Sequence, residues 1–222
     1  MKVVVVAAHP DDEVLGCGGT IARHAAEGDT VYAVFMADGV TSRFTAGDLD
    51  LTTRHAAAET AGKILGISEK FFLGLPDNRM DSAPLLEVVQ KLEPIINKVN
   101  PNIVYTHHYG DLNVDHRITH QAVLIACRPL PGSSVQAIYA FEIMSSTEWA
   151  TPTAHPFIPN HFVNITNYEQ KKMLALAAYE KEIHDEPHSR SAEHIAQLGR
   201  HRGCSVGVQS AEAFVLIRNL LN

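Results

Sequence analysis

The sequence predicts an α/β protein with a Rossmann-like, mostly parallel sheet flanked by helices, folded as a single domain over residues 1–222. The segment Val3–Ala7 is a continuous apolar run rich in valine, which is typical of a strand buried on both faces of a parallel sheet. The glycine-rich segment Gly16–Gly19 and a helical pattern follow, and Thr30–Ala37 is a second apolar strand. Strand, helix and strand in this order make a βαβ unit, from which parallel sheets are built. A length of 222 residues with 45% apolar side chains suits one domain with a sizeable core.

The next elements continue this alternation. Asp38–Leu51 is polar and is predicted to be a long loop at the mouth of the sheet. We expect a helix at Thr53–Leu65 and a third strand at Glu69–Leu73. Apolar residues recur at helical spacing over Leu85–Val99, but Pro94 lies inside this stretch and predicts a kink or two short helices.

The second half of the chain begins with a fourth strand at Asn102–His107, followed by a loop at His108–Val114 and a helix over residues 115–127. Further on, Thr166 and Glu169 have the spacing of a capping box, which predicts the start of a helix. The remaining predicted elements are strands at Val135–Glu142, Phe162–Ile165 and Phe214–Ile217, and helices over residues 166–183 and 191–198.

Composition and charge narrow the function classes. The net charge of −7 disfavours nucleic acid or an anionic membrane as the main partner. No run approaches the roughly 18 apolar residues of a membrane span, and the start of the chain does not resemble a signal peptide. The three cysteines are widely spaced, so disulfides and thiolate zinc sites are not expected. These features favour a cytoplasmic protein that acts on a small molecule.

Two segments rich in acids and histidines come directly after predicted strands. The first is Ala8–Glu13, and the second is His107–His116, more than about a hundred residues later. In open α/β sheets, ligands bind outside the carboxyl ends of the strands. We therefore expect the two segments to meet at one edge of the sheet and to form a site there.

The residue types in these segments predict a metal centre. Two histidines and one carboxylate make a three-ligand set that leaves a zinc coordination position open for water, and His9, Asp12 and His116 supply it. Pro10 stiffens the turn between the first two ligands. Asp11 then lies beside the metal without binding it. Zinc lowers the pKa of bound water to about 7, so a carboxylate there can act as a general base.

Other interpretations of these patterns remain open. The acids of Asp11–Glu13 are also typical of a helix N-terminus, although a cap explains neither His9 nor the second cluster. Gly16–Gly19 suggests a dinucleotide site, but the spacing is not Gly-x-Gly-x-x-Gly, and we interpret these glycines as allowing the helix to pack closely on the sheet. Two histidines and a carboxylate also describe the iron site of non-haem oxygenases. A non-catalytic carbohydrate- or nucleotide-binding module is the last alternative.

The motifs resemble those of the PIG-L/LmbE-like family of zinc-dependent de-N-acetylases, which remove acetyl groups from N-acetylglucosamine-type sugars. The matching segments are His9–Glu13, Gly16–Thr20, Arg54–Gly66, Asp115–His116, Arg202–Gly203 and Ala211–Phe214. The first is highly specific, whereas the last two are only supportive. The resemblance implies metal binding by His9, Asp12 and His116, with zinc expected and iron(II) as the alternative. It also implies that Asp11 is the general base and later the acid that protonates the leaving amine.

The resemblance further implies that Arg54 faces the substrate or acetate pocket, the alternative being an ordinary exposed helix arginine. One position departs from the family pattern, because Asn113 stands where many members carry a histidine that polarises the acetyl carbonyl. An asparagine amide donates a hydrogen bond but carries no charge. We expect Asn113 to contact the substrate, with His107 or His108 as alternative donors. Asp115 is predicted to take part in catalysis by orienting a neighbouring histidine or Asn113.

These predictions combine into a metal-dependent hydrolase that removes an acetyl group from an N-acetylated amino sugar or glycoconjugate. The loop Asp38–Leu51 and the region Thr147–His161 are expected to shape the substrate pocket, where Trp149 either stacks on a sugar or packs in the fold. Which N-acetylated compound is the substrate stays open. A homo-oligomer is compatible with the resemblance, but no sequence feature requires one.

Overall fold

A seven-stranded sheet in the order β3-β2-β1-β4-β5-β7-β6 forms the centre of the computed structural model, which describes residues 1–42 and 48–221. The strands are β1 (Lys2–Ala7), β2 (Thr30–Ala37), β3 (Ile67–Leu75), β4 (Ile103–His107), β5 (Ala137–Phe141), β6 (His161–Asn164) and β7 (Ala211–Asn219). Strands β3, β2, β1, β4 and β5 pair in parallel, and β7 is antiparallel to both of its neighbours. The predicted α/β class with a mostly parallel sheet is therefore confirmed.

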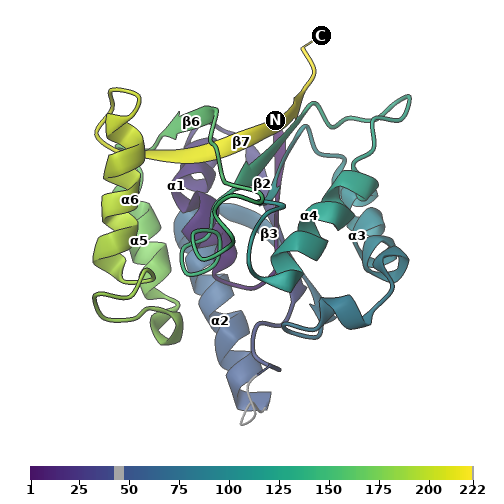
Figure 1. The fold of residues 1–222 in the computed structure, drawn as a ribbon. Helices are drawn as coiled ribbons and strands as arrows, with labels where there is room; N and C mark the ends of the chain where they lie inside the picture. Colours follow the sequence, from purple (N-terminus) through teal and green to yellow (C-terminus); the bar gives the residue numbers. More distant parts are fainter. Residues whose placement is uncertain (43–47, 222) are drawn as a thin grey trace.

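Helices cover both faces of this sheet (Figure 1). They are α1 (Asp12–Ala26), α2 (Asp48–Leu65), α3 (Leu85–Val99), α4 (Val114–Ala126), α5 (Glu169–Ala177) and α6 (Ala192–Cys204), with short 3₁₀ helices η1 (Met80–Ser82) and η2 (Glu180–Glu182). None of the helices in the described part of the chain is long and apolar enough to span a membrane.

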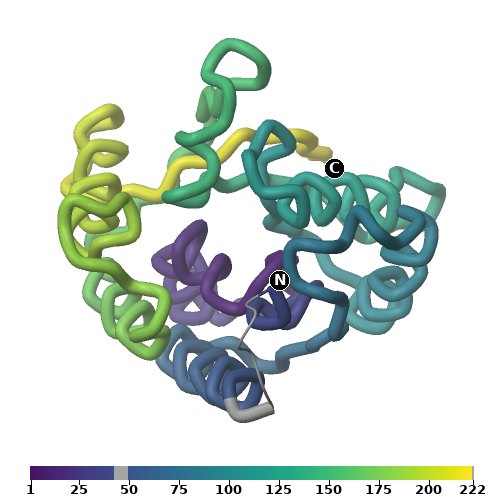
Figure 2. Tube along the Cα trace, turned by 60° about the horizontal axis from the view of Figure 1, so that its bottom comes forward, coloured from purple at the N-terminus to yellow at the C-terminus, as the bar shows by residue number. Residues whose placement is uncertain are grey.

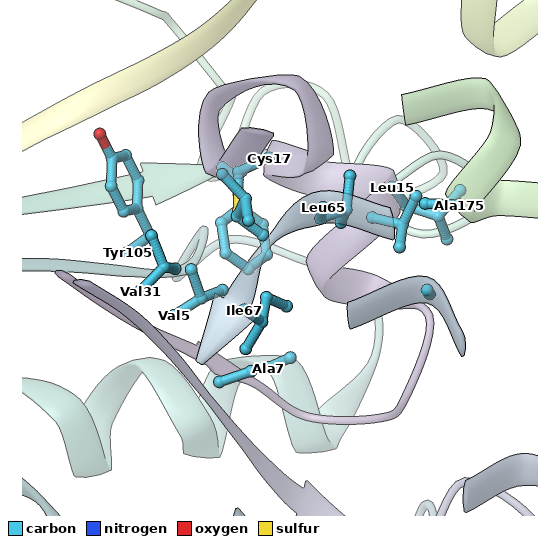
Figure 3. Packing of buried hydrophobic residues seen from close by; sticks show 14 of the residues in the cluster. Val5, Ala7, Leu15, Cys17, Val31, Leu65, Ile67, Tyr105 and Ala175 are labelled. Carbon is cyan, nitrogen blue, oxygen red and sulfur yellow. The ribbon is translucent and has the colours of Figure 1, made fainter. Parts of the chain in front are cut away.

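Strand β1 shows why the opening valine run folds as a central strand. Val3 and Val5 belong to the core formed with α1, α2, α5 and α6, whereas Val4 and Val6 belong to the core formed with α3 and α4. Figure 3 shows Val5 and Ala7 among side chains from the first of these layers. Successive side chains of a strand point to opposite faces, so an unbroken apolar run packs into the apolar cores on both faces of the sheet.

Two predictions about helices in the first half were wrong. Helix α2 begins at Asp48, inside the stretch predicted as the loop Asp38–Leu51, and residues 43–47 of that stretch lie outside the described residues. Helix α3 is one continuous helix with Pro94 inside it, so the predicted alternative of two short helices was wrong. Leu92 and Ile96 on either side of the proline are buried, and their packing against the sheet holds the helix together.

The predicted capping box at Thr166 was also wrong. Helix α5 begins later, at Glu169, after Tyr168 in the cap position. The Thr166 hydroxyl donates instead to the carbonyl of Ser210, next to β7. The helix ends at Ala177, before η2, so it is shorter than the predicted span. The Thr166 side chain, which the local pattern assigned to the helix cap, therefore makes a tertiary contact instead.

Candidate active site

The helix that follows β1 is broken at Cys17, whose φ of −149° and ψ of 26° are not helical. The carboxylate of Glu212 accepts hydrogen bonds from the backbone N–H groups of Gly19 and Thr20, so it caps the second half of α1. Lys172 Nζ donates to a backbone carbonyl of the first half and lies 2.7 Å from Glu212 Oε1. We call Lys172 and Glu212 the brace, because this buried pair joins the two halves of α1.

The glycines around this break allow close packing rather than phosphate binding. A Cβ on Gly16 would collide with the ring of Phe141, and one on Gly19 would lie 2.8 Å from the side chain of Ile165. Helix α1 therefore sits against neighbouring side chains at these positions, as the sequence interpretation expected. The first turn of α1 is thereby fixed at the end of β1, where the predicted metal ligands lie.

The structure brings His9, Asp12 and His116 together at the carboxyl ends of β1 and β4. Asp12 Oδ2 lies 3.4 Å from His9 Nδ1 and 3.4 Å from His116 Nε2. One ligand atom from each residue fits within 4.8 Å of the others, and all three side chains are buried. Figure 2, in which the bottom of Figure 1 comes forward, shows the purple start of α1 near the middle of a ring of surrounding segments. Two segments far apart in the sequence thus form one cluster.

Several atoms of this cluster are suited to hold a metal ion. Asp12 Oδ1 and His116 Nε2 are buried and have no hydrogen-bond partner in the described part of the chain, although His116 Nε2 lies 3.4 Å from Asp12 Oδ2. Buried polar atoms are rarely left in this state unless water, an ion or a ligand satisfies them. Two imidazoles and one carboxylate are the donors of a catalytic zinc site with an open position. The residues therefore fit a divalent metal, and their ligand roles remain predictions.

Carboxylates surround the histidines of the cluster and orient their rings. His9 Nε2 donates to Asp115 Oδ2 at 3.0 Å and lies 3.1 Å from Asp77 Oδ1. On the other side, His116 Nδ1 lies 3.1 Å from Asp111 Oδ1. This arrangement directs the opposite nitrogen of each ring toward Asp12, as in carboxylate–histidine–metal arrangements.

Burial alone would lower the pKa of His116, but the carboxylates of Asp12 and Asp111 outweigh it and raise that pKa to about 9. In the same way, neighbouring carboxylates hold the pKa of His9 above its usual range against the effect of burial. The site thus has an excess of negative charge that favours a cation. The sequence prediction missed Asp77, and it gave no role to Asp111 although this residue lies in the predicted segment His107–His116.

Asp11 is buried beside the cluster and faces two arginines. Its Oδ2 accepts a hydrogen bond from Arg190 Nη1 at 3.1 Å and lies 3.6 Å from Arg54 Nη1. Burial raises the pKa of Asp11, and the two guanidinium groups oppose that rise. Arg190 comes from the segment before α6 and belongs to no motif, so sequence reasoning did not find it.

Arg54 is 7% exposed, so its alternative role as an ordinary exposed helix arginine was wrong. Its Nη1 also lies 3.1 Å from Glu182 Oε1, and its Nη2 donates to the carbonyl of Gly39 at 3.0 Å. The side chain therefore links α2 to the segment after α5 and to Asp11. Contact with the substrate stays a prediction for this residue.

Asn113 occupies the cap position of α4. Its Oδ1 accepts a hydrogen bond from the backbone N–H of Asp115 at 2.8 Å, and its Nδ2 donates to Asn78 Oδ1 at 2.9 Å. An amide nitrogen carries two hydrogens, so one N–H remains for a substrate oxygen. Asp115 is held in turn by the backbone N–H groups of Asn78 and Met80, which supports an orienting role toward His9.

The two histidines at the end of β4 are buried. His107 Nε2 accepts a hydrogen bond from the backbone N–H of Ala8 at 2.8 Å, and burial lowers its pKa. His108 Nε2 donates to the carbonyl of His155 at 2.9 Å. These bonds engage Nε2 of each ring in the fold and leave Nδ1 of each without a hydrogen-bond partner in the described part of the chain, so both histidines stay predicted alternatives to Asn113 as the substrate donor. Trp149 is 53% exposed and contacts His188 edge-on, so it is not a core residue.

Comparison with known proteins agrees with this arrangement. The family model described as PIG-L, GlcNAc-PI de-N-acetylase, matches residues 4–127, which contain the segments Ala8–Glu13 and His107–His116. An uncharacterized deacetylase, YaiS, of Escherichia coli is 33% identical over 81% of this chain and 89% of its own length. A probable N-acetyl-alpha-D-glucosaminyl L-malate deacetylase 2 of Bacillus cereus is 28% identical over 80% of this chain and 81% of its own length.

Among solved structures, the N,N'-diacetylchitobiose deacetylase of Pyrococcus horikoshii superposes with a TM-score of 0.79 at 23% identity. The superposition covers 98% of this chain and 84% of that protein, so the two share a fold over nearly their whole length. The family match extends over more than half of the chain and includes His9, Asp12 and His116. This chain therefore belongs to the PIG-L family of de-N-acetylases.

Proposed function

We propose that this protein is a metal-dependent hydrolase that removes the acetyl group from an N-acetylated amino sugar or glycoconjugate. The observation that carries the proposal is a buried His9–Asp12–His116 cluster with unsatisfied donor atoms beside a buried carboxylate, Asp11. The family membership and the relatives named as deacetylases support the same reaction class. We favour zinc, because two imidazoles and a carboxylate suit it, and iron(II) is the alternative.

His9, Asp12 and His116 would hold the metal, which would supply Lewis acidity toward water and the acetamide carbonyl. Asp11 accepts the proton of the attacking water, and the new C–O bond forms as the carbonyl becomes tetrahedral. The free N–H of Asn113 donates to the oxygen that gains negative charge. Asp11 then returns the proton to the amine nitrogen as the C–N bond breaks. Acetate and a free amino sugar are the products.

Arginines on two sides orient Asp11 for this proton transfer and oppose the rise in its pKa that burial causes. Arg190 and Arg54 both lie near Asp11 Oδ2, and Glu182 balances part of their positive charge. Exposed Trp149 offers a flat apolar face on which a sugar ring can stack. We further propose a cytoplasmic location, because Cys17, Cys127 and Cys204 are free thiols.

The test is release of acetate and primary amine from a panel of N-acetylated sugars, with zinc or iron(II) and with or without a chelator. We expect equimolar acetate and amine under anaerobic conditions, and loss of both when the chelator is present. Oxygen-dependent turnover without acetate would favour the oxygenase alternative. Sugar binding without turnover by the metal-loaded protein, unaffected by the chelator, would favour a non-catalytic binding module.

A further inference from the structure

The backbone of Asp11 has a conformation that aspartate rarely adopts, with φ of 133° and ψ of −32°. An aspartate directly before a helix normally turns its carboxylate back to cap the helix end. Asp11 makes no such side-chain cap, and its carboxylate reaches Arg190 and Arg54 instead. Conformations of this kind persist only where surrounding contacts impose them, and they cluster at functional sites.

Glu13 contacts this backbone directly, at the N–H group of Asp11. Its Oε2 accepts a hydrogen bond from the backbone N–H of Asp11 at 2.9 Å. Its Oε1 accepts a second hydrogen bond, at 2.6 Å, from the hydroxyl of Tyr179, which lies between α5 and η2. Glu13 is fully buried and Tyr179 is 2% exposed. The tyrosine thus holds the carboxylate, and the carboxylate holds the Asp11 backbone.

The presence of a carboxylate at this position calls for an explanation. An apolar side chain would fill the same buried space without the desolvation cost of a carboxyl group, and burial raises the pKa of Glu13 to about 8. Both oxygens of Glu13 are engaged, one by the Asp11 backbone and one by Tyr179. The carboxylate is therefore suited to transmit the position of Tyr179 to the Asp11 turn.

We propose that Glu13 and Tyr179 are positioning residues that keep the Asp11 carboxylate turned away from the helix end and toward the reacting water. This inference rests on the proposed function, because it takes Asp11 as the general base. Neither side chain needs to touch the substrate. Their effect is on the rate of proton transfer and not on substrate binding or metal binding.

The first test is Tyr179→Phe, which removes only the hydroxyl. We expect kcat to fall about tenfold, with KM and metal content within about twofold of the wild type, because small misplacements of a catalytic group cost rate. The matched control is Tyr105→Phe, which removes another buried hydroxyl, bonded to His24 Nε2 at 3.0 Å. An unchanged kcat in Tyr179→Phe, or an equal fall in Tyr105→Phe, would overturn the proposal.

A rescue pair separates positioning from mere packing. Glu13→Gln keeps an oxygen that can accept from the Asp11 backbone, whereas Glu13→Met has a similar length and no such acceptor. We expect Glu13→Gln to retain at least about tenfold more of the wild-type kcat than Glu13→Met. Equal kcat values in the two folded variants would contradict a role through the Asp11 N–H group.

Crystal structures of the wild type and Tyr179→Phe provide a readout that does not depend on activity. We expect Asp11 to leave its positive φ in the variant, with its carboxylate displaced from Arg190. An Asp11 turn that stays unchanged in the variant would overturn the positioning role. If the wild type releases no amine from any N-acetylated substrate, the proposed function fails, and these structures still decide whether Tyr179 holds Asp11.

Discussion

Two buried charged clusters contact α1, and they differ in how completely their atoms are hydrogen bonded. In the brace, Glu212 accepts bonds from two backbone N–H groups, from the Thr20 hydroxyl and from Lys172. In the His9–Asp12–His116 cluster, Asp12 Oδ1 and His116 Nε2 have no hydrogen-bond partner in the described parts of the chain. The residues of both clusters are buried.

This difference in hydrogen bonding separates the buried charges that stabilise the fold from those that are available for a ligand. A saturated network stabilises the arrangement that it joins, whereas unsaturated atoms at this depth need a further partner. The brace therefore fixes α1, and the start of α1 presents Asp12 to the two histidines. Substitutions in the two clusters should separate stability from metal binding, and the following predictions test that separation.

Removing a predicted metal ligand should have the largest effect. We expect Asp12→Ala to lose nearly all bound metal and to lower kcat/KM by about 10³-fold or more, because the Lewis acid is lost with its ligand. Metal analysis of the purified variant and amine release measure the two effects. Full metal content in Asp12→Ala would show that the ion is bound at another site.

Removing the proposed base should affect rate and leave the metal in place. We expect Asp11→Asn to lower kcat by about 10²- to 10⁴-fold, which is the usual contribution of general acid–base catalysis. Metal content should match the wild type, because Asp11 is not a predicted ligand. Full activity in Asp11→Asn with metal bound would refute the assignment of Asp11 as the base.

Breaking the brace should show the opposite pattern. We expect Lys172→Met to lower the free energy of unfolding by about 3 kcal/mol, because it leaves the carboxylate of Glu212 buried without its cation. Urea denaturation measures this loss, and the folded variant should still bind about one metal per chain. A variant of normal stability that binds no metal would reverse the roles assigned to the two clusters.

The smallest effect should come from Asp115, a carboxylate that contacts the predicted ligand His9. Asp115→Asn weakens the hydrogen bond to His9 Nε2, and such changes typically cost about 10- to 100-fold in metal affinity. Competition with a chromogenic chelator measures the affinity. An affinity equal to that of the wild type would show that Asp77, which lies 3.1 Å from the same nitrogen, orients His9 without Asp115.

The sequence predicted the features that depend on short-range pattern. The structure has β1 and β2 almost within the predicted bounds, Val3–Ala7 and Thr30–Ala37, because apolar runs between polar turns indicate buried strands. The meeting of His9 and His116 followed from parallel topology, since the carboxyl ends of such strands share one edge.

The features that were missed depend on contacts between distant segments. Arg190 and Tyr179 reach Asp11 and Glu13 from more than about 160 residues away, and neither lies in a recognisable motif. At Thr166, a bond to the Ser210 carbonyl displaced the helix start that the local spacing indicated. Only the folded chain makes these contacts visible.

The most direct test of the account is the metal content of the purified protein, measured before and after addition of zinc or iron(II). We predict about one metal ion per chain, bound by the wild type and lost in Asp12→Ala. A protein that contains no metal and takes up neither zinc nor iron(II) would contradict the central claim. It would leave His9, Asp12 and His116 as structural residues.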